Sequence, residues 1–339
     1  MQTFAYAKRE VISKNSARKV FDLVSDELKL VEVEFEAQAR SNIRVVNFLS
    51  EYLRASGGKR VRPALLILTN YACGGEGDAE NIIRLATVME MLHTATLVHD
   101  DIIDNADTRR GRPSINARFG NQTSVLMGDW LYMSAFETSL AERRLEILDV
   151  LTRLTRKMTE GELIQMTMIG RLDITEAEYF DILKRKTAYL FSACCEIGAM
   201  LAGVDKATVS AMAAYGLDLG IAFQLADDLL DLTADDESLG KAAGVDLLEG
   251  KLTLPLIKLL EADPELRPEF EKMMLAGAYD DFSRAMIIDR LYFHGIVESI
   301  RERAYAHAEA AKKVLDVLSK TLYRQTLEEI PQFVIQRRS

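Results

Sequence analysis

Two short acidic motifs are the residues of this chain best suited to chemistry. Each reads DDxxD, at 100–104 and at 227–231, and each lies within an otherwise apolar run. On a helix the first and last acids of such a motif project from one face, because residues four apart lie one turn apart. Carboxylates in apolar surroundings must be paired, protonated or bound to a cation. The six acids that therefore indicate cation binding are Asp100, Asp101, Asp104, Asp227, Asp228 and Asp231.

Basic, glycine-containing loops accompany both acidic motifs. One loop, 57–63, precedes the first motif, a second, 105–113, follows it, and a third, 239–251, follows the second motif. Acids hold hard divalent cations, the cations bridge phosphate oxygens, and Lys and Arg take the remaining phosphate charge. The candidate ligands are all oxygen atoms with no Cys/His cluster nearby, which favours Mg²⁺ over Zn²⁺. The pattern therefore predicts a magnesium site that binds phosphate groups.

Helices are expected to position these residues. Only six prolines occur, and most of the length between them has helical spacing. Segments in which apolar and polar residues alternate between turn signals are hard to find, so the sequence predicts an all-α fold. No long Ser/Gly/Pro linker divides the chain. We therefore expect a single domain over residues 1–339, with residues 1–20 as a candidate N-terminal helical arm.

Composition excludes several classes of protein. The chain has 339 residues, 48% hydrophobic and 28% charged, as expected of a folded soluble protein. A net charge of −10 argues against a nucleic-acid partner, whose binding rests on basic surface. We see neither a long apolar run free of charge nor a secretory signal, so we expect no transmembrane segment. Cys73, Cys194 and Cys195 lack CxxC spacing, which favours reduced thiols and a cytoplasmic protein.

Taken together, the motifs resemble those of the trans-type isoprenyl (polyprenyl) diphosphate synthases. The resemblance covers residues 40–335 and is carried by GGKRVRP, MLHTATLVHDDIIDNADTRRGRPS, KRKTAYLF, FQLADDLLDL and LGKAAGVDLLEGKLTLPLI. It implies an isoprenoid synthase-type bundle of long helices around a central cavity, with the two acidic motifs facing each other at its mouth. It also implies a prenyltransferase that condenses isopentenyl diphosphate with an allylic diphosphate (geranyl, farnesyl or geranylgeranyl diphosphate). A homodimer and about three Mg²⁺ ions per active site, replaceable by Mn²⁺, are expected with it.

The resemblance also implies roles for individual residues. Asp100, Asp104 and Asp227 match direct Mg²⁺ ligands, whereas Asp101, Asp228 and Asp231 match positions that act through water or neighbouring groups. We count Asp231 with the metal site. The positions matched to the allylic diphosphate are Arg109, Lys186, Lys241 and Lys251. Those matched to isopentenyl diphosphate are Lys59, Arg62, His93 and Arg110, with Gly58 and Arg60 in the same loop. Thr187 and Gln224 match positions that steady a carbocation.

Other functions are weighed against this one. A terpene cyclase usually replaces the second motif with an Asn/Ser/Glu pattern, whereas this chain carries DDLLD and the GGKRVRP loop. A non-catalytic subunit of a synthase is expected to lose acids from one motif, and this chain keeps all six. A metal phosphohydrolase that uses His99–Asp100 fits poorly, since the four histidines contain no His-x-x-x-His pair. The C-terminal Arg337–Arg338 is either a solvated tail or a flap over the diphosphates.

Product length is read from the residues that precede the first motif. Ala95 and Thr96 lie about one turn before Asp100 and carry small side chains, whereas short-chain members of the family carry bulky aromatics there. The floor of the cavity is then expected on the helix that begins near residue 128. Phe136 is the candidate, with Tyr132 and Met133 as alternatives. We expect an octaprenyl- or heptaprenyl-like product of about C35–C50; a C20 geranylgeranyl or shorter farnesyl product is the alternative.

Overall fold

The computed structural model describes residues 22–55, 57–233, 244–279 and 283–336. It divides into two compact units. The first unit holds the described residues up to Thr152, with Ala193–Ala213 and Val317–Leu327; the second holds Arg153–Ser192, Ala214–Asp316 and the residues from Glu328 onward. The boundaries fall within four α-helices and one short 3-10 helix, and the expected single domain stays a prediction.

The first unit is built from helices and one small hairpin. Its elements are α2 (Ser25–Gln38), α3 (Arg44–Ala55), α4 (Val61–Ala72), α5 (Glu80–Ile103), β1 (Thr108–Arg109), β2 (Arg112–Pro113), α6 (Ile115–Phe119) and α7 (Asn121–Ala141). Parts of α8 (Leu145–Met168), α10 (Tyr189–Leu201), α11 (Lys206–Thr233) and α18 (Leu322–Ile335) also belong to it.

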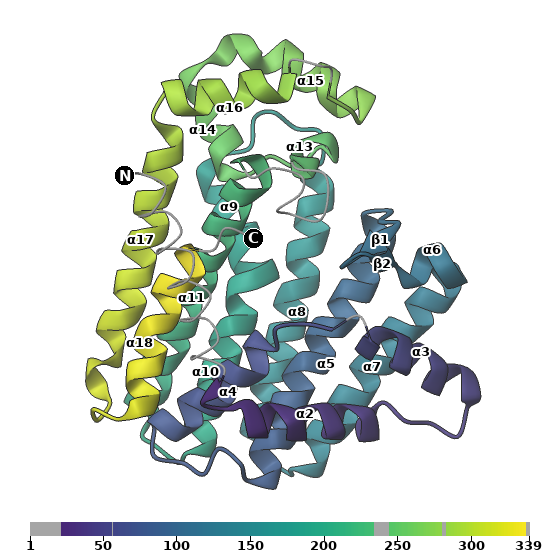
Figure 1. Cartoon of the computed structure of the whole chain (residues 1–339), viewed down its shortest axis with the longest axis vertical. Coiled ribbons are helices and arrows are strands. Elements are labelled where there is room, and N and C mark those ends of the chain that lie inside the picture. The colour runs from purple at the N-terminus through teal and green to yellow at the C-terminus, as the bar shows by residue number, and fades with distance from the viewer. Residues whose placement is uncertain (1–21, 56, 234–243, 280–282, 337–339) are drawn as a thin grey trace, which may run out of the picture. The chain divides into compact units, whose positions relative to one another are not determined.

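Helix α5 is the centre of the first unit. It packs against α2, α4 and α7, and its apolar residues surround it on all sides, as expected of a buried helix. Helix α7 lies beside it and runs antiparallel (Figure 1). Ser124 Oγ lies 3.5 Å from the Val98 carbonyl oxygen at one end, and Arg84 pairs with Glu142 at the other. Each turn along α7 therefore leads one turn away from the acidic end of α5.

The second unit is also helical. Besides parts of the four shared helices, it contains α9 (Glu176–Leu183), the π-helix η1 (Lys184–Ala188), α13 (Val245–Leu248), α14 (Leu254–Ala262), η2 (Pro264–Leu266), α15 (Arg267–Ala276), α16 (Ser283–Phe293), α17 (Ile296–Val314) and η3 (Leu315–Val317). Leu225 and Leu229 of α11 belong to its hydrophobic core with Phe270 and Ile300. The core thus fixes the helix that carries the second acidic motif.

Helix α11 has the length and composition of a membrane-spanning helix. It has 28 residues, and 44% of its most apolar window is buried inside the protein. The core helix of a soluble protein meets the same test, so this helix is weak evidence for a membrane span. Sequence analysis had not singled it out in this way.

Candidate active site

The first acidic motif lies at the C-terminal end of α5. Asp100 and Asp101 belong to its last turn, and Asp104 caps it. Asp100 and Asp104 are partly exposed, whereas Asp101 is buried. The C-terminal end of a helix carries a partial negative charge, which adds to the mutual repulsion of the acids. A cation bound here would relieve both.

Asp101 holds the arginine hairpin. Its Oδ1 accepts hydrogen bonds from Arg109 Nε at 2.7 Å and is paired with Arg109 Nη2 at 2.6 Å. Burial raises the pKa of Asp101, and the guanidinium of Arg109 opposes that rise. Its backbone carbonyl accepts hydrogen bonds from Ala106 and from the side chain of Asn116. Asp101 therefore acts on the site by fixing Arg109 and the loop beside it.

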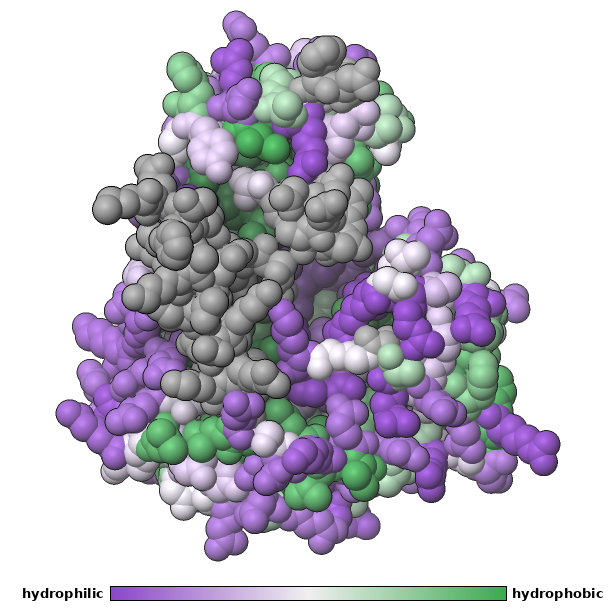
Figure 2. Space-filling view, in the orientation of Figure 1, coloured by the Kyte–Doolittle hydropathy of each residue, from purple (hydrophilic) through white to green (hydrophobic). Residues whose placement is uncertain are grey.

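The two strands of the hairpin are joined by a tight turn made of Arg110 and Gly111. Strands β1 and β2 pair Arg109 with Arg112, and the two residues between them have φ of +52° and +74°. Positive φ at both central positions is the geometry of a two-residue turn that matches the twist of antiparallel strands. The turn displays Arg110 at its tip. Figure 2 shows hydrophilic residues gathered around this part of the first unit.

Four arginines gather around His93. Burial lowers the pKa of His93 well below its usual value, and the neighbouring arginines lower it further. The imidazole is therefore neutral at neutral pH. Gly58 lies in the same group, because a Cβ there would approach Arg110 Nη1 to 2.8 Å and Arg60 Nη1 to 2.9 Å. Glu90 and Glu32 compensate Arg60 and Asp101 compensates Arg109, but the concentration of guanidinium groups still favours an anion. The arginines are Arg60, Arg62, Arg109 and Arg110.

Arg60 and Arg110 are held differently. Arg60 pairs with Glu90 at 2.7 Å and also with Glu32, and its side chain is only 14% exposed. Arg110 makes no ion pair within the part of the chain that the structure describes; burial lowers its pKa, Arg60 and Arg109 lower it further, and Glu90 opposes them. We therefore expect Arg60 to anchor the loop rather than to contact substrate, a change from the sequence analysis. Arg110 remains as the guanidinium available to an anion.

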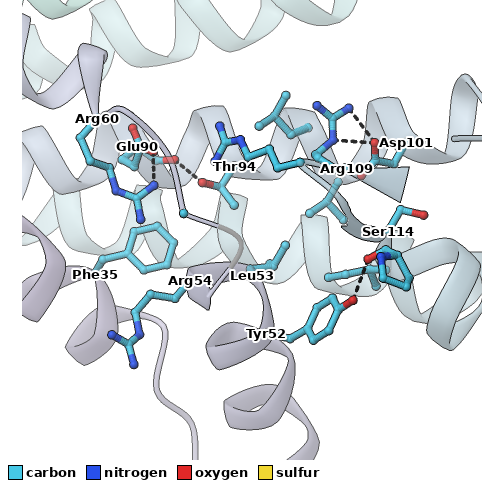
Figure 3. A pocket seen from close by; sticks show the side chains of 16 residues that line it. Phe35, Tyr52, Leu53, Arg54, Arg60, Glu90, Thr94, Asp101, Arg109 and Ser114 are labelled. Carbon is cyan, nitrogen blue, oxygen red and sulfur yellow. Dashed lines mark hydrogen bonds and ion pairs between the residues drawn. The ribbon is translucent and has the colours of Figure 1, made fainter. Parts of the chain in front are cut away.

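A pocket lies between the basic loop and the hairpin. Its volume is about 600 Å³ including its open mouth, and its lining includes Tyr52, Gly57, Arg60, Glu90 and Arg110 (Figure 3). The residues of α5 that line it are Thr94, Leu97, Val98 and Asp101. They lie on a face that is turned about 100° from the face of His93 and Asp100. The pocket therefore adjoins the acidic face without containing its exposed carboxylates.

The second acidic motif has one exposed acid and two buried ones. Asp227 is exposed, whereas Asp228 and Asp231 are each 5% exposed. Asp228 accepts hydrogen bonds from Tyr179 Oη at 2.5 Å and from Gln224 Nε2 at 2.7 Å. Burial raises the pKa of Asp228 to about 8, with contributions from Asp246 and Asp227. The acids are crowded enough to favour either a proton or a cation.

The π-helix η1 carries Lys186 and Thr187. Thr187 Oγ1 donates to Gln224 Oε1 at 2.8 Å, so Thr187, Gln224, Asp228 and Tyr179 form one hydrogen-bonded chain. Lys186 Nζ is paired with Glu162 at 2.7 Å and donates to Gln165. Single π-helical turns occur often at functional sites. The structure thus brings together Thr187, Gln224 and Asp228, which the sequence predicted for catalysis.

Some neighbours of the predicted residues were missed by sequence analysis. Tyr179, Glu162 and Gln165 contact predicted residues across different helices, and no motif marks them. Lys251 is paired with Glu249 at 2.7 Å and is 13% exposed. Lys241, Arg337 and Arg338 lie outside the described residues. The predicted roles of these four basic residues stay predictions.

The carboxylates fit a magnesium ion that arrives with its substrate. Within the ranges that the structure describes, no three His, Cys, Asp or Glu side chains converge to hold a metal by themselves. Mg²⁺ commonly uses one or two carboxylates and takes its remaining ligands from substrate phosphates and water. Because the donors are all oxygens and Asp228 is crowded by other acids, the residues suit a hard cation.

The residues expected to set product length lie along α5 and α7. Ala95 is fully buried and Thr96 is partly exposed. Tyr132 stacks on His99 with 5.9 Å between ring centroids, and burial and Asp100 raise its pKa to about 12. It therefore lies near the acidic end of α5, and Phe136 lies one turn farther from it. Met133 is 62% exposed, which favours Phe136 over it, and the roles of all these residues in product length stay predictions.

Comparison with known proteins places these features in a family. Residues 44–286 match the model of the family described as "Polyprenyl synthetase". The octaprenyl diphosphate synthase of Escherichia coli (strain K12) is 36% identical over 94% of this chain and 98% of that protein. A short chain isoprenyl diphosphate synthase of Methanothermobacter thermautotrophicus is 37% identical over 85% of this chain and 89% of that protein. The crystal structure of a polyprenyl synthase from Caulobacter crescentus CB15, complexed with calcium and isoprenyl diphosphate, has a TM-score of 0.89 and 34% identity. It covers 95% of this chain and 98% of that one.

Proposed function

The chain belongs to the polyprenyl synthetase family, and on that premise we propose that it makes a long-chain polyprenyl diphosphate of about C35–C50. It is a trans-prenyltransferase with the all-α isoprenoid synthase fold. Its substrates are isopentenyl diphosphate and an allylic diphosphate. No feature of the described residues favours a terpene cyclase or a non-catalytic subunit. We further propose that it works in the cytoplasm.

The arginine cluster around His93 is the observation that supports a prenyltransferase with a diphosphate-binding site. It brings the loop of Gly58 and the hairpin of Arg110 together beside the first acidic motif. A diphosphate carries several negative charges and many acceptor oxygens, which suit guanidinium groups. Arg110 in particular makes no ion pair within the described ranges. We assign this cluster to the diphosphate of isopentenyl diphosphate.

The reaction joins two substrates by ionisation and condensation. The C1–O bond of the allylic diphosphate breaks, and its electron pair leaves with the diphosphate. The double bond of isopentenyl diphosphate attacks the allylic cation and forms a C–C bond. A proton then leaves the new cation, the double bond is restored, and we assign that proton to the departing diphosphate. The product is one five-carbon unit longer.

The protein groups of the second unit suit the ionisation step. The Thr187 hydroxyl donates a hydrogen bond to Gln224 Oε1, so its oxygen keeps lone pairs that can face a cation. Lys186 is held by Glu162 and Gln165, and we assign it to the leaving diphosphate. Asp100 and Asp104 of the first motif and Asp227 and Asp231 of the second are the carboxylates that would hold Mg²⁺, which would supply Lewis-acid stabilisation of the leaving group. A set of about three ions, replaceable by Mn²⁺, is part of the proposal.

The direct test uses the purified chain alone. We expect it to consume labelled isopentenyl diphosphate with farnesyl diphosphate and Mg²⁺, and to release products of about C35–C50. Consumption without elongation beyond C20 would favour the shorter-chain alternative. No consumption with geranyl, farnesyl or geranylgeranyl diphosphate would favour the non-catalytic subunit.

Substitution of basic residues is expected to separate the two diphosphate sites. Lys59→Ala and Arg62→Ala should raise KM for isopentenyl diphosphate about tenfold to a hundredfold, because each removes a charge-assisted contact to phosphate. Lys186→Ala and Lys241→Ala should instead raise KM for the allylic substrate and slow its ionisation. Steady-state kinetics with each substrate varied in turn measures both effects.

Two exposed basic residues provide controls for that comparison. Arg40, which follows the end of α2, forms an exposed pair with Glu36 of that helix, and Lys272 forms an exposed pair with Glu269 within α15. Their alanine variants should leave both KM values within about twofold of the parent, since exposed pairs contribute little. Parallel changes of the two KM values in all four site variants would contradict the assignment of separate sites.

Helix α7 offers a surface for the homodimer that we propose. Leu126, Met133 and Leu140 follow one another at seven-residue spacing and are 68%, 62% and 48% exposed. Residues seven apart lie on one side of a helix, and a two-fold dimer can use the same surface of both copies. Helix α2 also exposes Leu30 and Val33, and Figure 2 shows apolar residues along its edge.

The dimer prediction is tested by sedimentation. We expect the chain to sediment as a dimer, and the double variant Leu126→Asp with Met133→Asp to sediment as a monomer of 38.0 kDa, because it places two charges in an apolar contact. Leu275→Asp on α15 is the control, since that residue is 90% exposed and lies outside the stripe. A stable, active monomer of the parent chain would refute the proposal.

A further inference from the structure

Tyr52 of α3 joins the arginine hairpin to the rest of the first unit. Its Oη donates a hydrogen bond to the backbone oxygen of Pro113, the last residue of β2, at 2.7 Å. Tyr52 itself is 7% exposed, and Figure 3 shows its hydroxyl directed at the hairpin. A buried phenol normally finds a hydrogen-bond partner, and this one has found it on the strand that closes the hairpin. The hydroxyl therefore fixes the position of that strand.

Three further side chains gather on the ring of Tyr52. The guanidinium carbons of Arg112 and Arg118 lie 4.7 Å and 4.9 Å from the ring centroid, which is cation–π distance. The ring of Phe119 meets it edge-on at 5.5 Å. Arg112 belongs to β2 and the other two residues to α6. One aromatic ring thus holds the returning strand and the helix that follows it.

Helix α3 also contacts the basic loop. The backbone N–H of Gly57, at the start of the loop, donates a hydrogen bond to the Arg54 carbonyl oxygen of α3 at 3.0 Å. The loop and the hairpin meet where Gly58 faces the guanidinium of Arg110. One helix therefore contacts both halves of the arginine cluster, the loop through Arg54 and the hairpin through Tyr52.

We propose that Tyr52 is a positioning residue for isopentenyl diphosphate, which it serves by holding Arg110 against the Gly58 loop. The inference rests on the proposed function, because it assumes that Arg110 binds that diphosphate. Arg109 has its own anchor in Asp101. Arg110 lies in the left-handed turn and makes no ion pair within the described ranges. Asp101 anchors the β1 side of the hairpin through Arg109, and Tyr52 anchors the β2 side through Pro113, so the place of Arg110 at the turn depends on both anchors.

Tyr52→Phe separates the hydroxyl from the ring. We expect KM for isopentenyl diphosphate to rise about two- to tenfold, the effect of losing one neutral hydrogen bond. KM for the allylic substrate and kcat should stay within about twofold, since Arg109 keeps its anchor. Tyr52→Leu also removes the cation–π contacts and should raise the same KM further. Steady-state kinetics with each substrate varied separately measures the split.

A double-mutant cycle tests whether Tyr52 acts through Arg110. Arg110→Ala should raise KM for isopentenyl diphosphate strongly, and adding Tyr52→Phe to it should change little more, because the group being positioned is gone. Tyr71→Phe is the matched control. Its hydroxyl donates to Glu27 at 2.6 Å in the same unit, and its ring stacks on Tyr323. Both KM values of the control should equal those of the parent chain.

The outcomes distinguish this inference from the proposed function. Two results would overturn the inference alone. In the first, Tyr52→Phe raises KM for isopentenyl diphosphate by the same factor in the parent chain and in the Arg110→Ala variant. In the second, Tyr52→Phe raises KM for both substrates in parallel. No effect of Arg110→Ala on isopentenyl diphosphate would overturn the site assignment and the inference with it. Should Tyr52→Phe fail to fold, Arg118→Gln leaves Tyr52 in place and should raise the same KM by a smaller factor. An unchanged KM in that variant would also overturn the inference.

Discussion

Replacement of Asp100 or Asp227 by alanine is expected to lower kcat by about three orders of magnitude. Loss of one group that stabilises charge in the transition state typically lowers kcat by about 10²–10³, and each of these acids is assigned as a direct ligand of the cation. Asp100 is partly exposed and Asp227 is exposed, so neither side chain is part of the buried core. Their loss should therefore leave the fold intact.

The measurement is turnover at saturating substrates, with circular dichroism for helix content. Asp26→Ala and Asp289→Ala are matched controls, because both residues are exposed acids on helices away from the motifs. The controls should retain the parent turnover. Activity should also require Mg²⁺ or Mn²⁺ and disappear in excess chelator. Near-parent turnover in either site variant, or full activity with chelator, would contradict the metal assignment.

Replacement of Ala95 by phenylalanine or tyrosine is expected to shorten the product from about C35–C50 to about C15–C20. Ala95 lies about one turn before the acidic end of α5 and is fully buried. A ring added there fills the path of a chain that grows past α5. It also overpacks the helix, which typically costs about 1–3 kcal/mol of stability. Thr96 is partly exposed, so Thr96→Phe is the variant that disturbs packing less.

Product length is measured by chromatography of the labelled prenyl chains. Phe136→Ala should lengthen the product, because it removes the candidate floor on α7. Ala308→Phe is the control for overpacking, since Ala308 is 1% exposed and lies on α17 in the second unit. It should lower thermal stability without shortening the product. A parent enzyme that stops at C15 or C20 with ample isopentenyl diphosphate would refute the long-chain proposal.

The sequence by itself determined the helical architecture and the family. Helical spacing and the scarcity of alternating segments predicted an all-α fold, and the structure confirms it. Within the described ranges all elements are helices apart from one hairpin, whose two strands have two residues each. Local patterns suffice here, because α5 and α11 carry apolar residues at helical spacing over many turns. The two acidic motifs and basic loops identified the family because their residue types and order are carried in the chain itself.

The tertiary structure decided how individual charges are used. Sequence places Arg60 and Arg110 in equivalent basic loops, yet Glu90 and Glu32 pair with the first and no acid of the described ranges pairs with the second. The partners come from distant segments, and spacing along the chain does not report which of them meet. For the same reason Tyr52 and Tyr179 carried no motif, although each donates a hydrogen bond to a segment 61 or 49 residues away.

Exposure was also settled only by packing. Met133 and Phe136 are similar in apolar character and lie three positions apart on α7, yet the first is 62% exposed and the second is partly buried. Helical periodicity tells which residues share a face, but the neighbouring helices decide which face is covered. The chain therefore encodes its helices and its reactive groups locally, whereas contacts between distant segments decide which charge is anchored and which is left for a ligand.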